Sequence, residues 1–214
     1  MLARTVKKSR IHIVLLFFLG GIYLFIPSCT HKKQGRVICD TVGLRNGDLL
    51  FRMGMGYESY VVSDMSNGEY SHIGLAWHNG KQWCAIHAVP GENEKGKPEY
   101  LKCEPIGEFF RPDRAQAGAR ARVNCPDSIA DAAARHAYQL VQHKVLFDND
   151  YDTSDSSRLY CTELVKQVYF PLNIDLVDDR YHLPPVFSDG PVYYPEDIWN
   201  SPLLQNKKKL KTTF

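Results

Sequence analysis

The sequence lacks the patterns that mark the common metal and nucleic-acid sites. Its six cysteines show no CxxC spacing, so no cysteine-based metal framework is expected. The acidic run at residues 148–152 lacks the glycine and the distal glutamate of a calcium loop. The lysine-rich segment at residues 207–211 is short and has no aromatic residue. We therefore expect no metal, no other cofactor and no nucleic-acid partner.

The apolar run at the N-terminus is short for a membrane span. It extends from Ile13 to Ile26 after four basic residues, whereas a transmembrane helix needs about 20 apolar residues. This pattern is typical of a cleaved export signal, and an uncleaved anchor is the alternative. Residues 26–29, Ile-Pro-Ser-Cys, resemble a bacterial lipobox, which predicts lipid attachment at Cys29 and a place in the cell envelope. A plain signal peptide with an incidental Cys29 is the alternative to that.

The chain length of 214 residues with 44% hydrophobic content suits one ordinary domain plus extensions. We divide it into a signal at 1–28, a tether at 29–45, a domain at 46–200 and a solvated basic tail at 201–214. Without residues 1–28 the formal charge falls from +2 to −2, since four basic residues and no acidic one are removed. Export would permit disulfides, with three possible pairings among four cysteines: Cys39, Cys84, Cys103 and Cys125.

Within the domain, the patterns predict a mixture of strands and helices. Strands are expected at residues 49–51, 100–103 and 119–123, a helix after Pro126, and a short helical turn at 196–199. Residues 57–70 show no clear periodicity and are expected to form a loop. Together these elements indicate an α+β fold.

A hairpin is predicted at residues 71–88, because Asn79-Gly80 favours a type I′ turn between alternating strands. A two-residue turn at these positions places His72 opposite His87, so that two imidazoles share one face. The small residues of that face are expected to leave room for the helix that begins near Cys161, while the other face is apolar. The small residues are Gly74, Ala76 and Ala85, and the apolar ones are Ile73, Leu75, Trp77 and Ile86.

Cys161 is the candidate nucleophile, since it stands where an amphipathic helix begins. The aliphatic residues Leu164, Val165 and Val168 follow it at helical spacing. A helix N-terminus lowers the pKa of a thiol and offers backbone N–H groups to an oxyanion, where Tyr160 would assist. His72 would act as base and His87 would orient it. A buried core cysteine and a zinc site of Cys161, His72 and His87 are the alternatives.

These motifs resemble those of known cysteine hydrolases. The segments 47–51, 71–75, 79–80 and 86–88 are similar to the run that carries the two histidines in NlpC-type cell-wall cysteine peptidases. In those proteins the cysteine motif comes first, whereas here residues 160–165 follow, as in the circularly permuted, papain-like YiiX/YebB group. The resemblance covers about residues 46–170. It implies a permuted papain-like fold with Cys161 as nucleophile, His72 as base and His87 as the third polar residue, where YiiX-like members often carry glutamate.

The predicted function is that of an exported, lipid-anchored cysteine peptidase or amidase. It would cleave an amide bond, most naturally in a cell-wall peptide, through a thioester on Cys161. Hydrolysis or transfer of lipid acyl groups on the same fold is a second hypothesis. A catalytically silent binding lipoprotein is a third.

Overall fold

The computed structural model describes residues 34–93, 95–178, 182 and 192–213. The chain divides after Lys32, and the described residues all belong to the second, compact unit, Lys33–Phe214. The predicted signal segment and Cys29 lie outside the described residues, as does the expected lipid attachment. Among the helices that the structure describes, none is long and apolar enough to cross a membrane.

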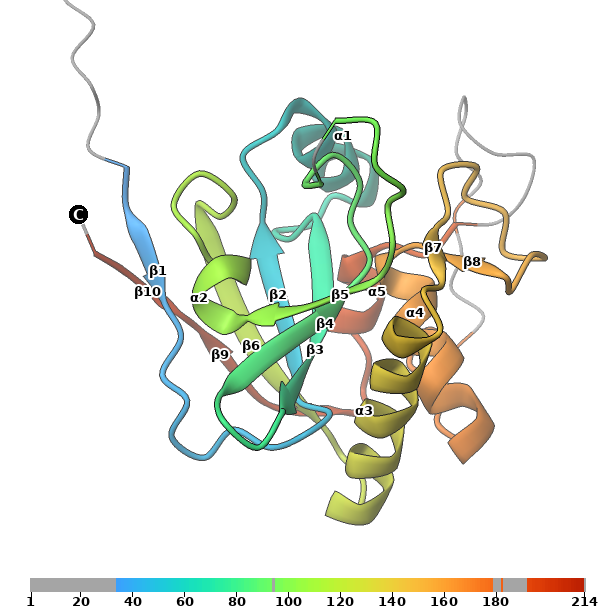
Figure 1. Cartoon of the computed structure of the whole chain (residues 1–214). Coiled ribbons are helices and arrows are strands. Elements are labelled where there is room, and N and C mark those ends of the chain that lie inside the picture. The colour runs from blue at the N-terminus through green and yellow to red at the C-terminus, as the bar shows by residue number, and fades with distance from the viewer. Residues whose placement is uncertain (1–33, 94, 179–181, 183–191, 214) are drawn as a thin grey trace, which may run out of the picture. The chain divides into compact units, whose positions relative to one another are not determined.

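A six-stranded antiparallel sheet forms the centre of the second unit (Figure 1), with the strand order β5-β4-β3-β2-β6-β9. Its strands are β2 (Leu49–Met53), β3 (His72–His78), β4 (Trp83–His87), β5 (Lys102–Pro105), β6 (Ala117–Val123) and β9 (Leu204–Lys209). Two short pairs flank it: β1 (Arg36–Ile38) with β10 (Lys211–Thr213), antiparallel, and β7 (Leu146–Phe147) with β8 (Arg158–Leu159), parallel.

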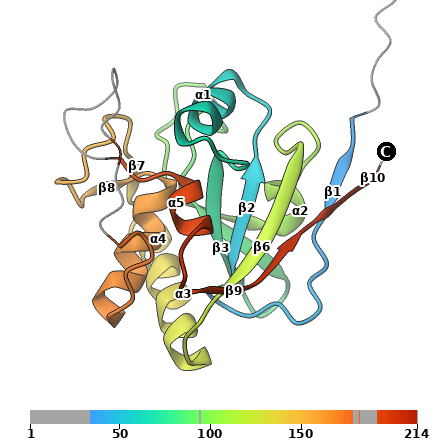
Figure 2. The same ribbon diagram turned by 180° about the vertical axis from the view of Figure 1, so that it is seen from behind.

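Helices cover the sheet because its alternating side chains make both faces partly apolar. The helices α3 (Asp127–Gln142) and α4 (Cys161–Tyr169) lie side by side in both views and pack against β3 (Figures 1 and 2). They bury the face that carries Phe51, Ile73 and Leu75. The short helix α2 (Ile106–Phe109) packs against β4 and β5, and its Phe109 belongs to the apolar cluster of the other face.

The predicted α+β class is confirmed, as are the helix after Pro126 and the helical turn near residue 196, which is α5 (Pro195–Trp199). The expected loop at residues 57–70 is wrong, because α1 (Tyr57–Ser66) occupies most of it. The helix was not predicted because its sequence carries no strong apolar stripe, and none of its residues is buried. A 3-10 turn, η1 (Phe170–Leu172), follows α4.

Both ends of the described chain contain strands where the sequence suggested a tether and a solvated tail. Strand β1 lies within residues 29–45, and it pairs with β10 from the segment 201–214. Strand β9 pairs with β6 and forms an edge of the main sheet. Lysines along an exposed edge strand discourage pairing with other chains, so a lysine-rich run is compatible with this position. The folded unit therefore extends beyond residues 46–200.

Candidate functional site

The β3–β4 hairpin turns one residue later than its sequence suggests. His78 faces Trp83, so the central residues of the turn are Gly80 and Lys81, not Asn79 and Gly80. Gly80 has a φ of +89°, and a type II′ turn requires positive φ only at this first central position. The side-chain oxygen of Asn79 accepts hydrogen bonds of 3.0 Å from the backbone N–H groups of Lys81 and Gln82. The predicted direct pairing of His72 with His87 is therefore wrong.

The two histidines are nevertheless in contact. The shifted register moves the residue opposite His87 by two positions along β3, and a shift of two keeps both histidine side chains on the same face of the sheet. His72 Nε2 lies 2.9 Å from His87 Nδ1. Both rings are buried, and that of His87 is fully so. Gly74 lies beside His87, where a Cβ atom would come within 3.1 Å of the His87 Cβ atom. The missing side chain leaves room for the His87 Cβ atom and for the Phe109 ring.

Glu104 of strand β5 extends the histidine pair. Its Oε1 atom lies 3.1 Å from His87 Nε2, and Arg114 Nη1 lies 3.1 Å from both carboxylate oxygens. Burial alone would raise the pKa of Glu104, but His87 and Arg114 lower it to about 2. The pKa values of both histidines are below their usual range, chiefly because burial disfavours the charged ring. Both imidazoles are therefore neutral near pH 7.

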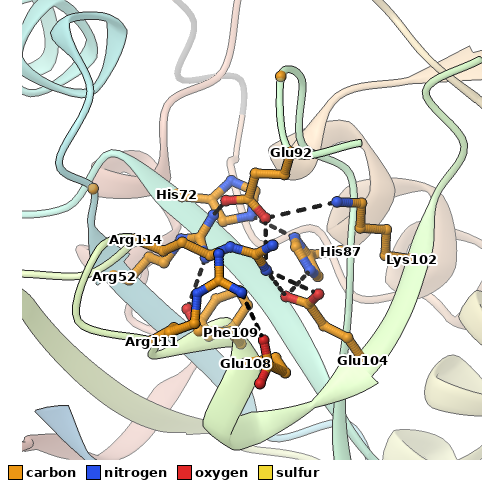
Figure 3. A network of polar contacts seen from close by, with 12 residues as sticks. Arg52, His72, His87, Glu92, Lys102, Glu104, Glu108, Phe109, Arg111 and Arg114 are labelled. Carbon is orange, nitrogen blue, oxygen red and sulfur yellow. Dashed lines mark hydrogen bonds and ion pairs between the residues drawn. The ribbon is translucent and has the colours of Figure 1, made fainter. Parts of the chain in front are cut away.

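Arg52 on β2 stands directly opposite His72 on β3. Figure 3 shows it within a network of charged side chains around the histidines. Its Nη1 donates to the Phe109 carbonyl oxygen at 2.7 Å, its Nη2 forms an ion pair with Glu92, and its guanidinium lies over the Phe109 ring. Glu92 is also paired with two further cations, Lys102 and Arg114. The positive charge of Arg52 contributes to the low pKa of His72.

Cys161 is the first residue of α4, as predicted, but the helix packs on the face opposite the histidines. The expectation that Gly74, Ala76 and Ala85 make room for the cysteine helix is wrong. These small residues accommodate α2 instead, and Phe109 contacts both histidine rings. The link between the thiol and the histidine face lies at the start of β3.

At the start of β3, the backbone N–H of Ile73 lies close enough to the Cys161 thiol to lower its pKa. Ile73 directly follows His72, so the thiol lies beside the strand end that carries the predicted base. Burial raises the pKa of the thiol, which differs from the predicted lowering by the helix N-terminus. The hydroxyl of Thr162, 3.7 Å away, and the charge of Arg52 act in the other direction. The resting side chain is therefore a thiol rather than a thiolate, and it needs a base.

Tyr160 caps α4 from a buried position. Its hydroxyl accepts the backbone N–H of Tyr193 at 2.9 Å, and its own N–H donates to Glu163 at 3.2 Å. Burial strongly raises the pKa of the Tyr160 phenol. These contacts give the Tyr160 side chain a structural role. Its predicted assistance in stabilising an oxyanion stays a prediction.

One group of three possible metal ligands occurs among the described residues, namely His87, Glu92 and Glu104. It differs from the zinc alternative of Cys161, His72 and His87. Three cationic side chains contact its two carboxylates: Arg52, Lys102 and Arg114. Because these charges already neutralise the carboxylates and would repel a metal ion, the group does not fit a divalent cation.

The five cysteines among the described residues are all free thiols. The thiols of Cys84 and Cys103, on the neighbouring strands β4 and β5, lie close enough to affect the pKa of each other. Of the three possible pairings, the one that joins Cys84 to Cys103 and Cys39 to Cys125 agrees with this proximity.

Four residues of the site were not predicted from the sequence: Arg52, Glu92, Glu104 and Arg114. The signal for Arg52 was present, since one arginine interrupts a buried apolar strand and buried arginines need partners. Glu104 and Arg114 carried no such signal, because ordinary charged residues on a strand and a loop suggest a solvated surface.

No protein-family model matches the sequence, and no curated protein matches it. The fold is similar to the crystal structure of the metalloprotein YiiX from Escherichia coli O157:H7. The TM-score is 0.63 at 16% sequence identity, and the match covers 78% of this chain and 97% of the YiiX chain. Identity this low shows the fold alone. The chain has a YiiX-like fold, and the resemblance drawn from its motifs is confirmed at that level.

Proposed function

We propose that this protein is a cysteine hydrolase that cleaves an amide bond through a thioester on Cys161. The observation that carries the proposal is the hydrogen-bonded pair of neutral histidines on β3 and β4, together with the packing of the cysteine helix α4 against β3. A partly buried thiol with a raised pKa is a poor nucleophile by itself, so a neutral base beside it is the group that hydrolysis requires.

In the proposed reaction, His72 takes the thiol proton while the sulfur attacks the carbonyl carbon. The backbone N–H groups at the start of α4 have no partner within the helix and stabilise the oxyanion. The C–N bond then breaks, and the amine leaves with the proton held by His72. Water attacks the thioester with His72 again as base, which releases the acid and restores the thiol.

The fold supports a circularly permuted, papain-like arrangement, since the cysteine helix follows the histidine strands in the chain. The substrate that fits the sequence signals best is a cell-wall peptide, reached after export and with a lipid anchor on Cys29. Lipid acyl hydrolysis or transfer uses the same nucleophile, so the two hypotheses differ in the bond that is cleaved.

The name of YiiX raises a metal-binding role as the second candidate for this chain. The three-ligand group at His87 is the observation that favours it. The surrounding cations argue against it, because a metal ion would have to displace Arg114 from Glu104 and Arg52 from Glu92. The hydrolase is the function that the site supports better.

Product analysis tests the proposal directly. The full-length chain is incubated with muropeptides and, separately, with lipid esters, and the products are identified by mass. We expect muropeptide fragments with one new amine and one new carboxyl group. Cys161→Ala should lower the rate by on the order of 10⁴-fold or more, because the nucleophile is lost.

Cys125→Ala is the matched control, since Cys125 is a partly buried thiol in the same core cluster and should leave the rate unchanged. Cleavage of the esters alone would favour the lipid hypothesis. Turnover that survives in Cys161→Ala, or no turnover of any substrate, would contradict the hydrolase and leave the binding lipoprotein.

A further inference from the structure

We infer that Glu104 is a positioning residue of this site, which acts through His87 to fix the tautomer of His72. The consequence of this inference for catalysis rests on the proposed function, whereas its geometry rests on the contacts among the described residues. Three side chains lie on one diagonal across β3, β4 and β5: His72, His87 and Glu104. Figure 3 shows both histidines and Glu104 in this arrangement.

The direction of every proton in this row follows from the charge on Glu104. With a pKa of about 2 the carboxylate is ionised near pH 7, so it can only accept a hydrogen bond. His87 must then carry its proton on Nε2, 3.1 Å from the carboxylate. A neutral imidazole has one N–H, so His87 Nδ1 is an acceptor.

The protonated nitrogen of His72 follows from the same reasoning. Because His87 Nδ1 accepts, His72 Nε2 must donate across the 2.9 Å contact. The proton of neutral His72 is thereby placed on Nε2, and Nδ1 keeps its lone pair. This assigns Nδ1 of His72 as the atom that takes the thiol proton.

Proton transfer from Cys161 gives a thiolate and a His72 imidazolium, with no net change in charge. The imidazolium then donates through Nε2 to His87, which donates to the Glu104 carboxylate. The positive charge is stabilised along the row without transfer of a proton to Glu104. His87 alone cannot fix this direction, since a neutral histidine can carry its proton on either nitrogen.

The strands make this contact specific. Glu104 pairs with Ala85 across β4 and β5, and the small side chain of Ala85 leaves the diagonal toward His87 open. Arg114 holds both carboxylate oxygens, so the side chain is fixed from its far end. A carboxylate thus reaches the site from β5, although the third position itself is occupied by His87.

The first test needs no enzymatic activity. In the full-length chain labelled with ¹⁵N, imidazole nitrogen shifts near pH 7 report which nitrogen of each histidine carries the proton. We expect the Nε2–H form for both His72 and His87. The Nδ1–H form of either ring in the wild-type chain overturns the inference, even if the chain hydrolyses nothing.

The second test uses Glu104→Gln, with Glu108→Gln as the matched control. Glu108 lies on α2 and pairs with the exposed Arg111 only, so its variant should keep both tautomers and the rate. Glu104→Gln should mix the His87 tautomers and lower kcat about 10- to 100-fold with little change in KM, because a supporting contact is lost. Unchanged tautomers with unchanged kcat overturn the inference. If Glu104→Gln does not fold, the tautomers are measured in Glu104→Asp instead. This variant keeps a carboxylate and should retain the Nε2–H forms, so the Nδ1–H form of either ring would overturn the inference.

Discussion

The two faces of the central sheet come from the same strands, yet different forces hold them. Phe51 and Arg52 are neighbours in β2 and both are buried. The ring of Phe51 packs against Tyr70 and Trp199 in the main core, whereas Arg52 is held by Glu92 and the Phe109 carbonyl oxygen. One face supplies stability through apolar burial, and the other places charges around two histidines.

The apolar face should show the largest effect on stability. Phe51→Ala removes a fully buried ring, which should lower the free energy of unfolding by about 3–5 kcal/mol. Hydrolysis per folded molecule should stay close to the wild-type rate, because the ring does not contact the histidine pair. Urea unfolding gives the first quantity and active-fraction kinetics give the second.

Arg52→Met is the comparison from the other face. It leaves the Phe109 carbonyl oxygen without its donor, and we expect a smaller loss, about 1–3 kcal/mol. The rate should nevertheless fall, since the charge of Arg52 lowers the pKa of the Cys161 thiol. A rate that falls more for Phe51→Ala than for Arg52→Met would remove the distinction between the faces.

The next prediction concerns the glycine between the histidine strands. A Cβ at Gly74 would lie 2.9 Å from the Ile86 carbonyl oxygen and 3.1 Å from the His87 Cβ, so Gly74→Ala must push these strands apart. We expect a loss of about 1–3 kcal/mol and a lower kcat. Gly107→Ala is the control, because its Cβ would meet nothing within 4 Å. Equal stability and kcat of the two variants in the same assays would contradict the close-packing argument.

These contrasts also explain which parts the sequence could predict. Alternation along residues 72–78 and 83–87 identifies both strands and their faces, since it depends on side-chain hydrophobicity alone. The turn was placed one residue early because Asn79 acts through its side chain, which propensities for φ do not reveal. The helix of Cys161 was assigned to the wrong face because small residues suit the ring of Phe109 as well as a helix.

The Glu104 contact could not be predicted from these patterns. It depends on the register of β5 against β4, and the connection at residues 88–101 is too long for a short turn sequence to set this register. Cys161 itself was found from its place at a helix start. Its environment depends on how α4 meets β3, which is a property of the packed core and not of either segment.

The comparison of the faces extends to the charge of two glutamates, the half-buried Glu104 and the buried Glu163. Glu104 has a lowered pKa among cations, whereas burial raises the pKa of Glu163 to about 8, with nearby aspartates adding to the effect. A raised pKa means that the folded state binds the proton more tightly, so this contribution to stability is complete below about pH 4.5 and is lost as the pH rises toward 8.

Glu163→Gln removes that dependence, because the amide stays neutral and still accepts the Tyr160 N–H. Compared with the wild type, the variant should gain stability as the pH rises from 4.5 to 8, by at most about 1.4 kcal/mol for each pH unit. Glu104→Gln should behave differently. In the wild type, the Glu104 carboxylate is ionised in both folded and unfolded chains over this range. The difference in stability between Glu104→Gln and the wild type should therefore be constant and should close only as the pH falls from 4.5 toward 2. Urea unfolding across this range measures both. A constant gap for Glu163→Gln would show that its carboxylate is ionised in the folded state, and the difference between the two glutamates would then lie in position and not in charge.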